Sequence, residues 1–382
     1  MGLPVGYLDF HSDDVLNYQL NRWYSFGYCR EEDLRRAGEA IGTYEDVPDV
    51  FTELAEDAER EGRLKNAAFY YRAAEFLTLP SDDRKQTLYT SFRRLFDRAF
   101  PEDTYDRHTV PYADGQLPVL HFEPERPAKS TIVAHGGLDS FIECWYALWR
   151  HFADHGYEVY AFEGPGQGGA HRRYGLTFEH DWEHPTGAIL DFFALEGVSL
   201  LGFSFGGYWC LRAAAFEDRI DRVISAPPLF NLLKSEGAFS QWLTETLMTV
   251  EGLMNLLIQL QMTLSSTANL YMQHVLFTTD RESPYQAAEW MLEMNDEHLH
   301  SDRVDQDVLL TTGENDAFQP PKLLRLQEDA LVNARSVTTR LFTEEEHADQ
   351  HCQVGNLGLA LNVMTNWLDE YAEDGPVEHP RS

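Results

Sequence analysis

The sequence predicts a protein of the α/β class, with a mostly parallel eight-stranded sheet, a helical N-terminal region and a helical cap inserted into the sheet domain. Three observations predict this class. The first hundred residues carry apolar side chains at helical spacing. From residue 109 onward, short apolar runs alternate with helical stretches, which is typical of a mostly parallel sheet covered on both faces. A long interval after about residue 230 breaks the alternation and contains no clear strand.

These changes of pattern divide the chain of 382 residues into four parts, which suits one large domain with additions or two domains. The expected parts are an N-terminal helical region at 1–108, a first part of the sheet domain at 109–229, a cap insertion at 230–304 and a second part of the sheet domain at 305–382.

The N-terminal region is expected to hold four helices. Apolar and aromatic residues recur at helical spacing in the segments 14–28, 47–58, 66–77 and 83–100. Pro80 ends the third of them, because proline cannot continue a helix. We expect most of the aromatic side chains to pack between the helices.

The sheet domain and its cap follow from the later pattern. Seven apolar runs are the clearest strands, at 117–122, 130–134, 157–162, 198–201, 222–225, 307–312 and 336–342, and a final helix is expected at 357–371. The cap follows the strand at 222–225, counted as the sixth of the eight expected strands, and is rich in methionine and aromatic residues, such as Met254, Met262 and Trp290. These side chains could line a substrate chamber or attach the cap to the core, and the sequence leaves both open.

Composition and charge exclude several classes of partner. With 43% hydrophobic residues the chain can bury a sizeable core. The net charge is −33, from 63 acidic against 30 basic residues, which argues against nucleic acids and anionic membranes as partners. Neither a nucleic acid nor a membrane is expected as a partner, and the expected partner is a small-molecule substrate.

The cysteines and the first residues of the chain indicate the cellular compartment in which the protein is expected. The four cysteines have neither metal-ligand spacing nor a dense disulfide pattern, so we expect reduced thiols. They are Cys29, Cys144, Cys210 and Cys352. The start lacks the basic and apolar regions of a signal peptide, and no apolar run has membrane-spanning length. The expectation is a soluble, cytoplasmic protein.

The segment Gly202-Phe203-Ser204-Phe205-Gly206 is the most informative motif. It follows an apolar run and precedes a helix-forming stretch, and that context is typical of a nucleophile elbow. Small residues two positions before and after the serine allow the sharp turn that exposes its hydroxyl group. Ser204 is therefore the candidate nucleophile, and a serine nucleophile needs a base and an acid that orients the base.

In a sheet of this type the acid and then the histidine come later in the chain. Asp316 follows the strand at 307–312 and is favoured as the acid over Glu314, because it lies deeper in its loop. Two histidines follow the last strand, and from the pattern alone either His347 or His351 could be the base.

An oxyanion forming at the carbonyl oxygen needs two hydrogen-bond donors. The first is expected to be the backbone N–H of Phe205, directly after the nucleophile. The second is expected from the glycine-containing turn after the strand at 130–134, through the N–H of Gly137 or Leu138. Asp139 and Glu163 are candidates for orienting the substrate, although each could instead hold a loop by accepting backbone N–H groups.

Five stretches together indicate a family. They are HGGLDSFIE (135–143), AFEGPGQGG (161–169), GFSFGGY (202–208), GEND (313–316) and HCQVGN (351–356). Over nearly the whole chain the sequence resembles the α/β-hydrolases grouped with 2,6-dihydroxypseudooxynicotine hydrolase, the fungal heptaketide-shortening pigment hydrolases and the FrsA-like proteins. The resemblance implies an α/β-hydrolase fold with N-terminal helices, frequent dimerisation, and cleavage of a carbon–carbon bond next to a ketone or of an ester, without metal or organic cofactor.

The resemblance also bears on the base. In those relatives the catalytic histidine is the one followed by Cys-Gln, which implies His351 here. Where the relatives usually have glycine, this chain has His347. On this reading Cys352 is a packed neighbour of the base, not a nucleophile or metal ligand.

The sequence therefore predicts a serine hydrolase that acts on a fairly large, hydrophobic, polyketide-like or aromatic substrate. Attack by Ser204 to form an acyl-enzyme and direct attack by water both remain open. The alternatives are a carboxylesterase or acyl-peptide-type hydrolase with the same three residues, and a non-catalytic, FrsA-like regulatory protein that keeps only the fold.

Overall fold

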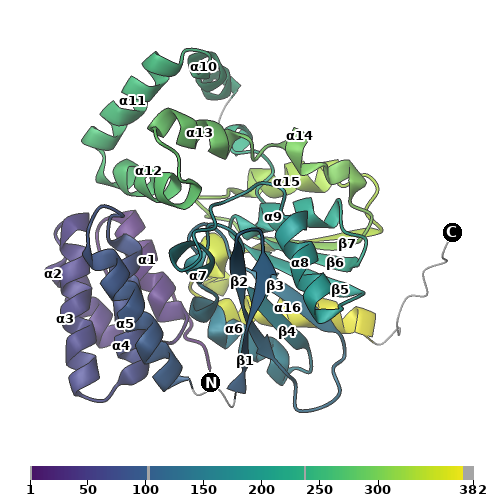
Figure 1. Cartoon of the computed structure of the whole chain (residues 1–382), viewed down its shortest axis with the longest axis horizontal. Helices are drawn as coiled ribbons and strands as arrows, with labels where there is room; N and C mark the ends of the chain where they lie inside the picture. The colour runs from purple at the N-terminus through teal and green to yellow at the C-terminus, as the bar shows by residue number, and fades with distance from the viewer. Residues whose placement is uncertain (1, 101–103, 236–237, 373–382) are drawn as a thin grey trace.

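An eight-stranded sheet runs through the core of the protein (Figure 1). The computed structural model describes residues 2–100, 104–235 and 238–372. The strands are β1 (Asp106–Tyr112), β2 (Gly115–Phe122), β3 (Thr131–His135), β4 (Glu158–Phe162), β5 (Val198–Phe203), β6 (Ile220–Ala226), β7 (Asp307–Gly313) and β8 (Ser336–Phe342). They lie in the order β1-β2-β4-β3-β5-β6-β7-β8. Only β2 pairs antiparallel, with β1 and β4, so the predicted mostly parallel, eight-stranded sheet is confirmed.

The sheet is buried on both faces by helices. Side chains alternate between its faces, so that Leu309 of β7 packs in one hydrophobic cluster while Val308 and Leu310 pack in the other. The first cluster joins the sheet to α6 (Tyr146–Asp154), α16 (Leu357–Ala372) and the N-terminal helices. The second joins it to α8 (Glu183–Phe193), α9 (Gly206–Ala214) and α15 (Pro321–Ala330). Burial on both faces explains why the inner strands are continuous apolar runs.

The strand β1 is one that the sequence pattern did not single out. It is the edge strand of the sheet, and Val110 is its only buried residue. Because the other side chains of β1 are exposed or half-buried, no apolar run marks it. Pro111 further weakens the strand signal, since proline is tolerated on edge strands and not in central ones. The strand begins at Asp106, inside the range 1–108 that the sequence assigns to the helical region.

In the described part of the N-terminal region there are five α-helices and a short 3-10 helix, Tyr44–Asp46. The α-helices are α1 (Asp14–Ser25), α2 (Glu31–Ala40), α3 (Val47–Arg60), α4 (Leu64–Leu77) and α5 (Arg84–Ala99). The expected helix at 14–28 ends at Ser25, and Gly27 then adopts a φ of 72°. The helix α2 was not predicted, because it is dominated by charged residues and has few apolar ones.

The N-terminal helices share one core with the sheet domain and do not form a separate body. Tyr28, which follows α1, stacks on Phe69 of α4 with ring centroids 3.8 Å apart. Its hydroxyl group also accepts the backbone N–H of Ala147 in α6 at 2.7 Å. In Figure 1 these helices stand beside the sheet, with α1 nearest to the centre of the molecule.

A buried cluster of charged side chains ties the two regions together. Glu75 of α4 pairs with Arg72 and with Lys85 of α5, and with Arg172 of α7 (Gly168–Arg172) at 2.7 Å. Arg172 also pairs with Asp139, in the loop after β3, and Arg72 donates to the backbone carbonyl of Asp139 at 2.9 Å. Burial raises the pKa of Glu75, but Arg172, Lys85 and Arg72 outweigh it and hold that pKa below its usual value.

We expect Glu75→Ala to lower the free energy of unfolding by about 3–5 kcal/mol, since it leaves buried cations without their partner. Urea denaturation measures this. The matched control is Glu59→Ala, which removes a partly exposed partner of Arg94 and should cost about 0–1 kcal/mol. Equal losses in the two variants would contradict a special role for the buried cluster.

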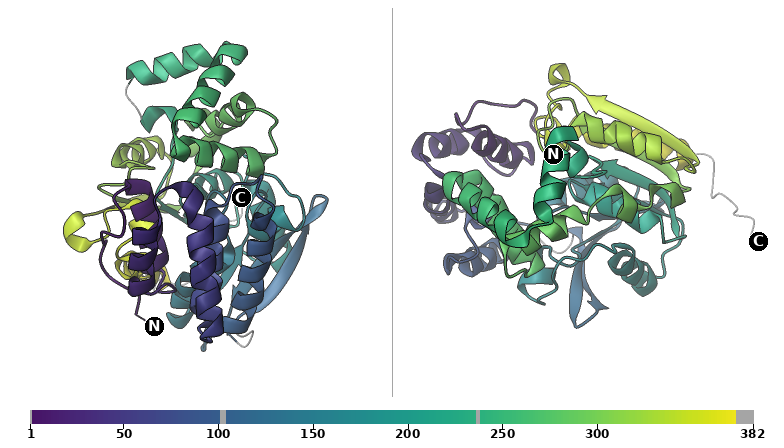
Figure 2. Two further views of the ribbon diagram at one scale, coloured as in Figure 1. Left: turned by 90° about the vertical axis from the view of Figure 1, so that its left-hand side faces the viewer. Right: turned by 90° about the horizontal axis from the view of Figure 1, so that it is seen from above.

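The cap lies between β6 and β7 and covers the carboxyl edge of the parallel strands (Figures 1 and 2). Its helices are α10 (Ala238–Met248), α11 (Glu251–Leu264), α12 (Ser266–Thr279), α13 (Pro284–Leu292) and α14 (Asp296–Leu299). Helix α12 contacts the N-terminal region, where the ring of His274 stacks on Phe76 with centroids 5.2 Å apart.

The apolar residues of the cap have several locations. Trp290 packs in the core, whereas Met291 lines a cavity. The helices α10 and α11 expose large apolar side chains, including Phe239, Leu256 and Leu264. Among the described residues, none of the helices has both the length and the apolar character that a membrane span needs.

Candidate active site

The turn between β5 and α9 holds Ser204 in a strained conformation. Its φ is 59°, in the left-handed region that residues other than glycine rarely adopt. The chain folds back so closely that a Cβ atom on Gly202 would lie 1.9 Å from the carbonyl oxygen of Gly206. Only glycine fits at that position. The turn therefore has the geometry of a nucleophile elbow, with Ser204 at its tip.

Three side chains from distant parts of the chain meet at this turn. The Nε2 atom of His351 lies 2.9 Å from Oγ of Ser204, and its Nδ1 atom lies 2.8 Å from Oδ2 of Asp316. Ser204 follows β5, Asp316 follows β7 and His351 follows β8, so all three lie at the carboxyl edge of the sheet. The arrangement is a continuous hydrogen-bonded chain of serine, histidine and aspartate.

Asp316 is itself held in place. Its Oδ1 atom accepts the backbone N–H groups of Phe318 at 2.9 Å and Gln319 at 2.7 Å, which leaves Oδ2 for His351. The side chain is almost fully buried. The carboxylate can therefore fix both the tautomer and the orientation of the imidazole ring.

The alternatives left open by the sequence lie elsewhere. Glu314 is exposed, and its carboxylate accepts the backbone N–H of Glu344. His347 is exposed as well, with a φ of 57° at the end of the short 3-10 helix Glu344–Glu346. A positive φ favours glycine, so His347 adopts a backbone conformation that is rare for its residue type. Among the described residues, the histidine bonded to Ser204 is His351.

The electrostatic surroundings of His351 favour its charged form. Burial lowers the pKa of His351, but the negative charge of Asp316 and the neighbouring Cys352 raise it more, so that the pKa lies above its usual value of 6.5. An imidazolium that forms when Ser204 loses its proton is thus stabilised.

The loop after β3 lies directly against the elbow. A Cβ atom on Gly137 would lie 2.7 Å from the backbone nitrogen of Phe205. The side-chain amide of Gln167 donates to the carbonyl oxygens of Gly136 at 2.7 Å and Gly137 at 2.9 Å. In a trans peptide the N–H points away from the carbonyl, so Gln167 turns the N–H groups of Gly137 and Leu138 to the opposite side.

The backbone N–H groups expected to hold an oxyanion lie at the cavity. Within the described part of the chain, the N–H groups of Phe205, Gly137 and Leu138 donate to no protein acceptor outside regular helices and strands. They lie beside Ser204, and all three residues line the same cavity. The sequence analysis did not single out Gln167, although it lies in the glycine-rich stretch 161–169.

The two acidic residues suggested as substrate-orienting groups have protein partners. Glu163 accepts the backbone N–H groups of Ile142 at 3.2 Å and Gly169 at 2.6 Å, as expected for the alternative in which it holds loops. It is buried and does not line the cavity. Asp139 does line the cavity, but its carboxylate is paired with Arg172.

A cavity of about 310 Å³ opens over Ser204. All three regions of the chain contribute to its wall, with Tyr18 and Phe76 from the N-terminal helices, Trp145 and Phe318 from the sheet domain, and Tyr271 and Met291 from the cap. The wall is mostly apolar. The volume of the cavity lies at the lower end of the range of about 300–1,000 Å³ for ligand pockets. The geometry thus places the serine in a hydrophobic chamber.

Several cavity residues were not recognised from the sequence, among them two on α1 and one on α12 that carry polar or basic groups. Tyr18 and Arg22 lie on α1, and His274 lies on α12. The hydroxyl group of Tyr18 donates to the backbone carbonyl of His351 at 3.3 Å. No motif marks these residues, because they reach the site only through the packing of whole helices. Cys352 is buried beside them, and its Sγ atom lies 3.7 Å from the carbonyl oxygen of Ala226.

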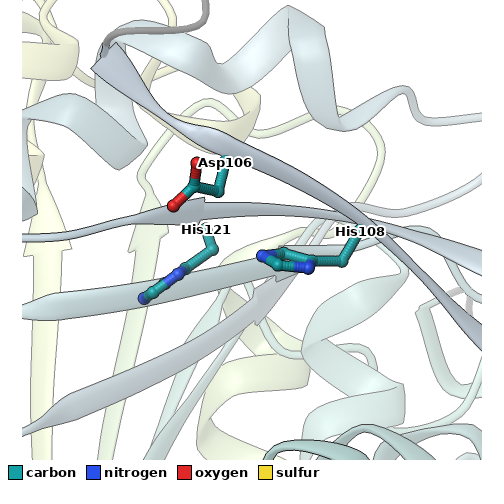
Figure 3. Close-up of side chains that lie close together, drawn as sticks. All are labelled: Asp106, His108 and His121. Carbon is teal, nitrogen blue, oxygen red and sulfur yellow. The ribbon is translucent and has the colours of Figure 1, made fainter.

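Side chains that could ligate a metal gather at another place. In the part of the chain that the structure describes, the one such group is Asp106, His108 and His121 on the hairpin of β1 and β2 (Figure 3). The Nε2 atom of His121 lies 3.0 Å from Oε1 of Glu158, and its ring stacks on Tyr160. None of these residues lines the cavity, so the group is separate from the site around Ser204.

The fold and the site agree with a comparison to protein families. Residues 132–354, more than half of the chain, match the model of the alpha/beta hydrolase family. The chain belongs to the alpha/beta hydrolase family, as the sequence motifs predicted.

Individual relatives are similar over different lengths. The chain is 33% identical over 202 residues to hydrolase acrC from Aspergillus aculeatus. This match covers 45% of this chain and 47% of acrC. It is 26% identical over 346 residues to the 20-hydroxy-prefusarin hydrolase FUS2 from Gibberella moniliformis. This match covers 79% of each of the two chains. The chain thus spans about half the length of the first curated relatives that it matches.

A solved structure has the same architecture. The crystal structure of 2,6-dihydroxy-pseudo-oxynicotine hydrolase matches with a TM-score of 0.67 at 20% identity, over 94% of this chain and 98% of that one. Because this match covers almost the whole chain, it extends to the N-terminal helices and the cap as well as the sheet domain. The predicted fold is thereby confirmed.

Proposed function

We propose that this protein is a serine hydrolase in which Ser204 is the nucleophile, His351 the general base and Asp316 the residue that orients it. The observation that carries the proposal is the hydrogen-bonded chain from Asp316 through His351 to Ser204, with distances of 2.8 and 2.9 Å. Side chains within this reach can transfer the serine proton to the imidazole as the hydroxyl oxygen attacks a carbonyl carbon.

The proposed reaction has two halves. In the first, the oxyanion of the tetrahedral intermediate accepts hydrogen bonds from the N–H of Phe205 and from the N–H of Gly137 or Leu138. The intermediate then expels its leaving group, which takes the proton from His351, and an acyl group remains on Ser204. In the second, His351 takes a proton from water, the resulting hydroxide attacks the acyl carbon, and Ser204 is released with its proton restored.

We infer that the bond cleaved is a carbon–carbon bond next to a ketone, or an ester, in a hydrophobic polyketide-like or aromatic molecule. The resemblance in the five sequence stretches supports this class. The apolar cavity wall supports a hydrophobic substrate. The relative FUS2 is named for a 20-hydroxy-prefusarin substrate. For a β-diketone, the electron pair of the broken bond stays on the carbon between the carbonyl groups and is stabilised as an enolate before protonation.

Turnover of an aryl β-diketone and of a p-nitrophenyl ester of similar size tests the proposal. We expect a higher kcat/KM for the diketone, with loss of both activities in Ser204→Ala. Turnover of the ester alone would replace the carbon–carbon assignment with a carboxylesterase. If neither substrate reacts and a fluorophosphonate probe fails to label Ser204, the protein is not a serine hydrolase.

The family resemblance further supports a homodimer, which we include in the proposal. Light scattering coupled to gel filtration is expected to give twice the mass of the chain, and a single-chain mass would remove this part of the proposal.

A further inference from the structure

One charged side chain in the catalytic cavity lacks a charged partner. Arg22 of α1 lines the cavity together with Ser204 and His351. Its guanidinium group donates to Oε1 of Gln19 at a long 3.5 Å. Among the described residues, no carboxylate forms an ion pair with Arg22, and no other lysine or arginine lines the cavity.

Most of the described arginines pair with a carboxylate, as Arg72 and Arg172 do, whereas Arg22 does not. The chain has 63 acidic and 30 basic residues, about two carboxylates for each cation, so most arginines find an acidic neighbour. Two buried arginines illustrate this, because Arg72 and Arg172 both pair with Glu75. The carboxylate of Asp139, which also lines the cavity, is occupied by Arg172.

The surroundings of Arg22 orient the guanidinium group without neutralising it. It lies over the rings of Phe76 at 4.9 Å and Trp23 at 5.0 Å. Contact with aromatic faces holds the planar group, while its edge carries the N–H donors that pair with a carboxylate or another delocalised oxygen anion. Because the cation is half-buried and has no anionic partner, part of the free energy needed to remove it from water stays uncompensated until an anion binds.

The position of Arg22 fits a substrate that also reaches Ser204. Tyr18 lies four residues earlier on α1, one helical turn away on the same face, and its hydroxyl group contacts the backbone of His351. His274, the other basic side chain from outside the sheet domain, is neutral at pH 7, because burial and then the charge of Lys85 lower its pKa to about 4. Arg22 is thus the permanent positive charge of the cavity wall.

We propose that Arg22 is a subsite for an oxygen anion, so that the substrate carries a carboxylate or an enolate in addition to the carbonyl group that Ser204 attacks. The inference rests on the proposed function, since it concerns the substrate of the same site. It makes Arg22 a specificity-determining residue supplied by the N-terminal helices.

Binding to a Ser204→Ala background tests the subsite without any turnover. The first pair of probes is phenylbutyrate and its neutral amide. The second pair is benzoylacetone and the analogue with two methyl groups on the carbon between its carbonyl groups, which cannot form the stabilised 1,3-diketone enolate. In calorimetric titrations we expect Arg22→Gln to raise the dissociation constant of phenylbutyrate or of benzoylacetone by about 10- to 100-fold, as for the loss of a charged hydrogen bond. The dissociation constants of the neutral analogues should stay within about twofold.

The pattern of losses identifies the anion. A loss confined to phenylbutyrate assigns a carboxylate, and a loss confined to benzoylacetone above the pKa of its enol assigns an enolate. Arg22→Lys keeps the charge and should recover part of the affinity. The matched control is Arg36→Gln, an exposed arginine of α2 that does not line the cavity.

Two results would overturn the subsite. If Arg22→Gln lowers the affinity for anionic and neutral probes equally, Arg22 only shapes the cavity wall. If neither anion binds more tightly to the protein with Arg22 than to the variant, no anion binds there. Because these titrations need no catalysis, they are independent of the serine mechanism. A Ser204→Ala variant that still turns over substrate would refute the mechanism and leave the binding result standing.

Discussion

Replacing Ser204 with alanine is expected to reduce kcat/KM for the best substrate by about 10⁴- to 10⁶-fold, the range found when a nucleophile of this kind is removed. The loss follows from the position of Ser204, whose Oγ atom is the group in contact with Nε2 of His351. Steady-state kinetics measures the loss, and circular dichroism checks that the fold is retained.

A second potential nucleophile in the cavity provides the control for this experiment. Cys352 is buried beside His351, so Cys352→Ala tests whether the thiol takes part in the reaction. We expect kcat/KM of this variant to fall by less than about tenfold. Unlike Ser204→Ala, it should still be labelled by a fluorophosphonate probe. If Ser204→Ala keeps a hundredth or more of the activity, water attacks the substrate directly and Ser204 is not the nucleophile.

Replacing Asp316 with asparagine is expected to lower kcat by about 10⁴-fold, because an amide no longer selects the productive tautomer of the imidazole. It should also change the pH dependence. The base works only when neutral, and the pKa of His351 is raised by Asp316, so the wild-type kcat/KM should increase with pH up to an inflection above pH 6.5. Without the carboxylate that inflection moves to lower pH.

The matched control for this variant is the neighbouring acid in the same turn. Glu314→Gln removes an exposed carboxylate that accepts the backbone N–H of Glu344, and both kcat and the pH profile should stay within about twofold of the wild type. An unchanged inflection in Asp316→Asn would show that another group controls the protonation of His351.

The parts of the site that depend on local sequence could be predicted. Ser204 is recognisable because its turn needs glycines at fixed positions, and the close approach of Gly202 to Gly206 is the physical reason for that spacing. Asp316 could be placed because it follows an apolar strand in a parallel sheet. For the base, the surrounding pattern left two histidines open, and the family resemblance was needed to favour His351.

Other parts depend on how distant elements pack, and no local pattern reports them. Tyr18 and Arg22 look like ordinary residues of an N-terminal helix, and only the docking of α1 against the sheet domain brings them to the cavity. The edge strand β1 was not singled out for a different reason, because a strand with one buried residue has no apolar run to detect.

The contact of Arg72 with the backbone of Asp139 has a consequence for dissecting this protein into smaller units. The match to the family model begins at residue 132, after all five N-terminal helices. A chimera that exchanged those helices for a foreign set would lose the donor to the turn that carries Gly137 and Leu138, and Arg172 would lose Glu75. The smallest transplantable unit must therefore keep α4 together with the sheet domain, even if other helices are replaced.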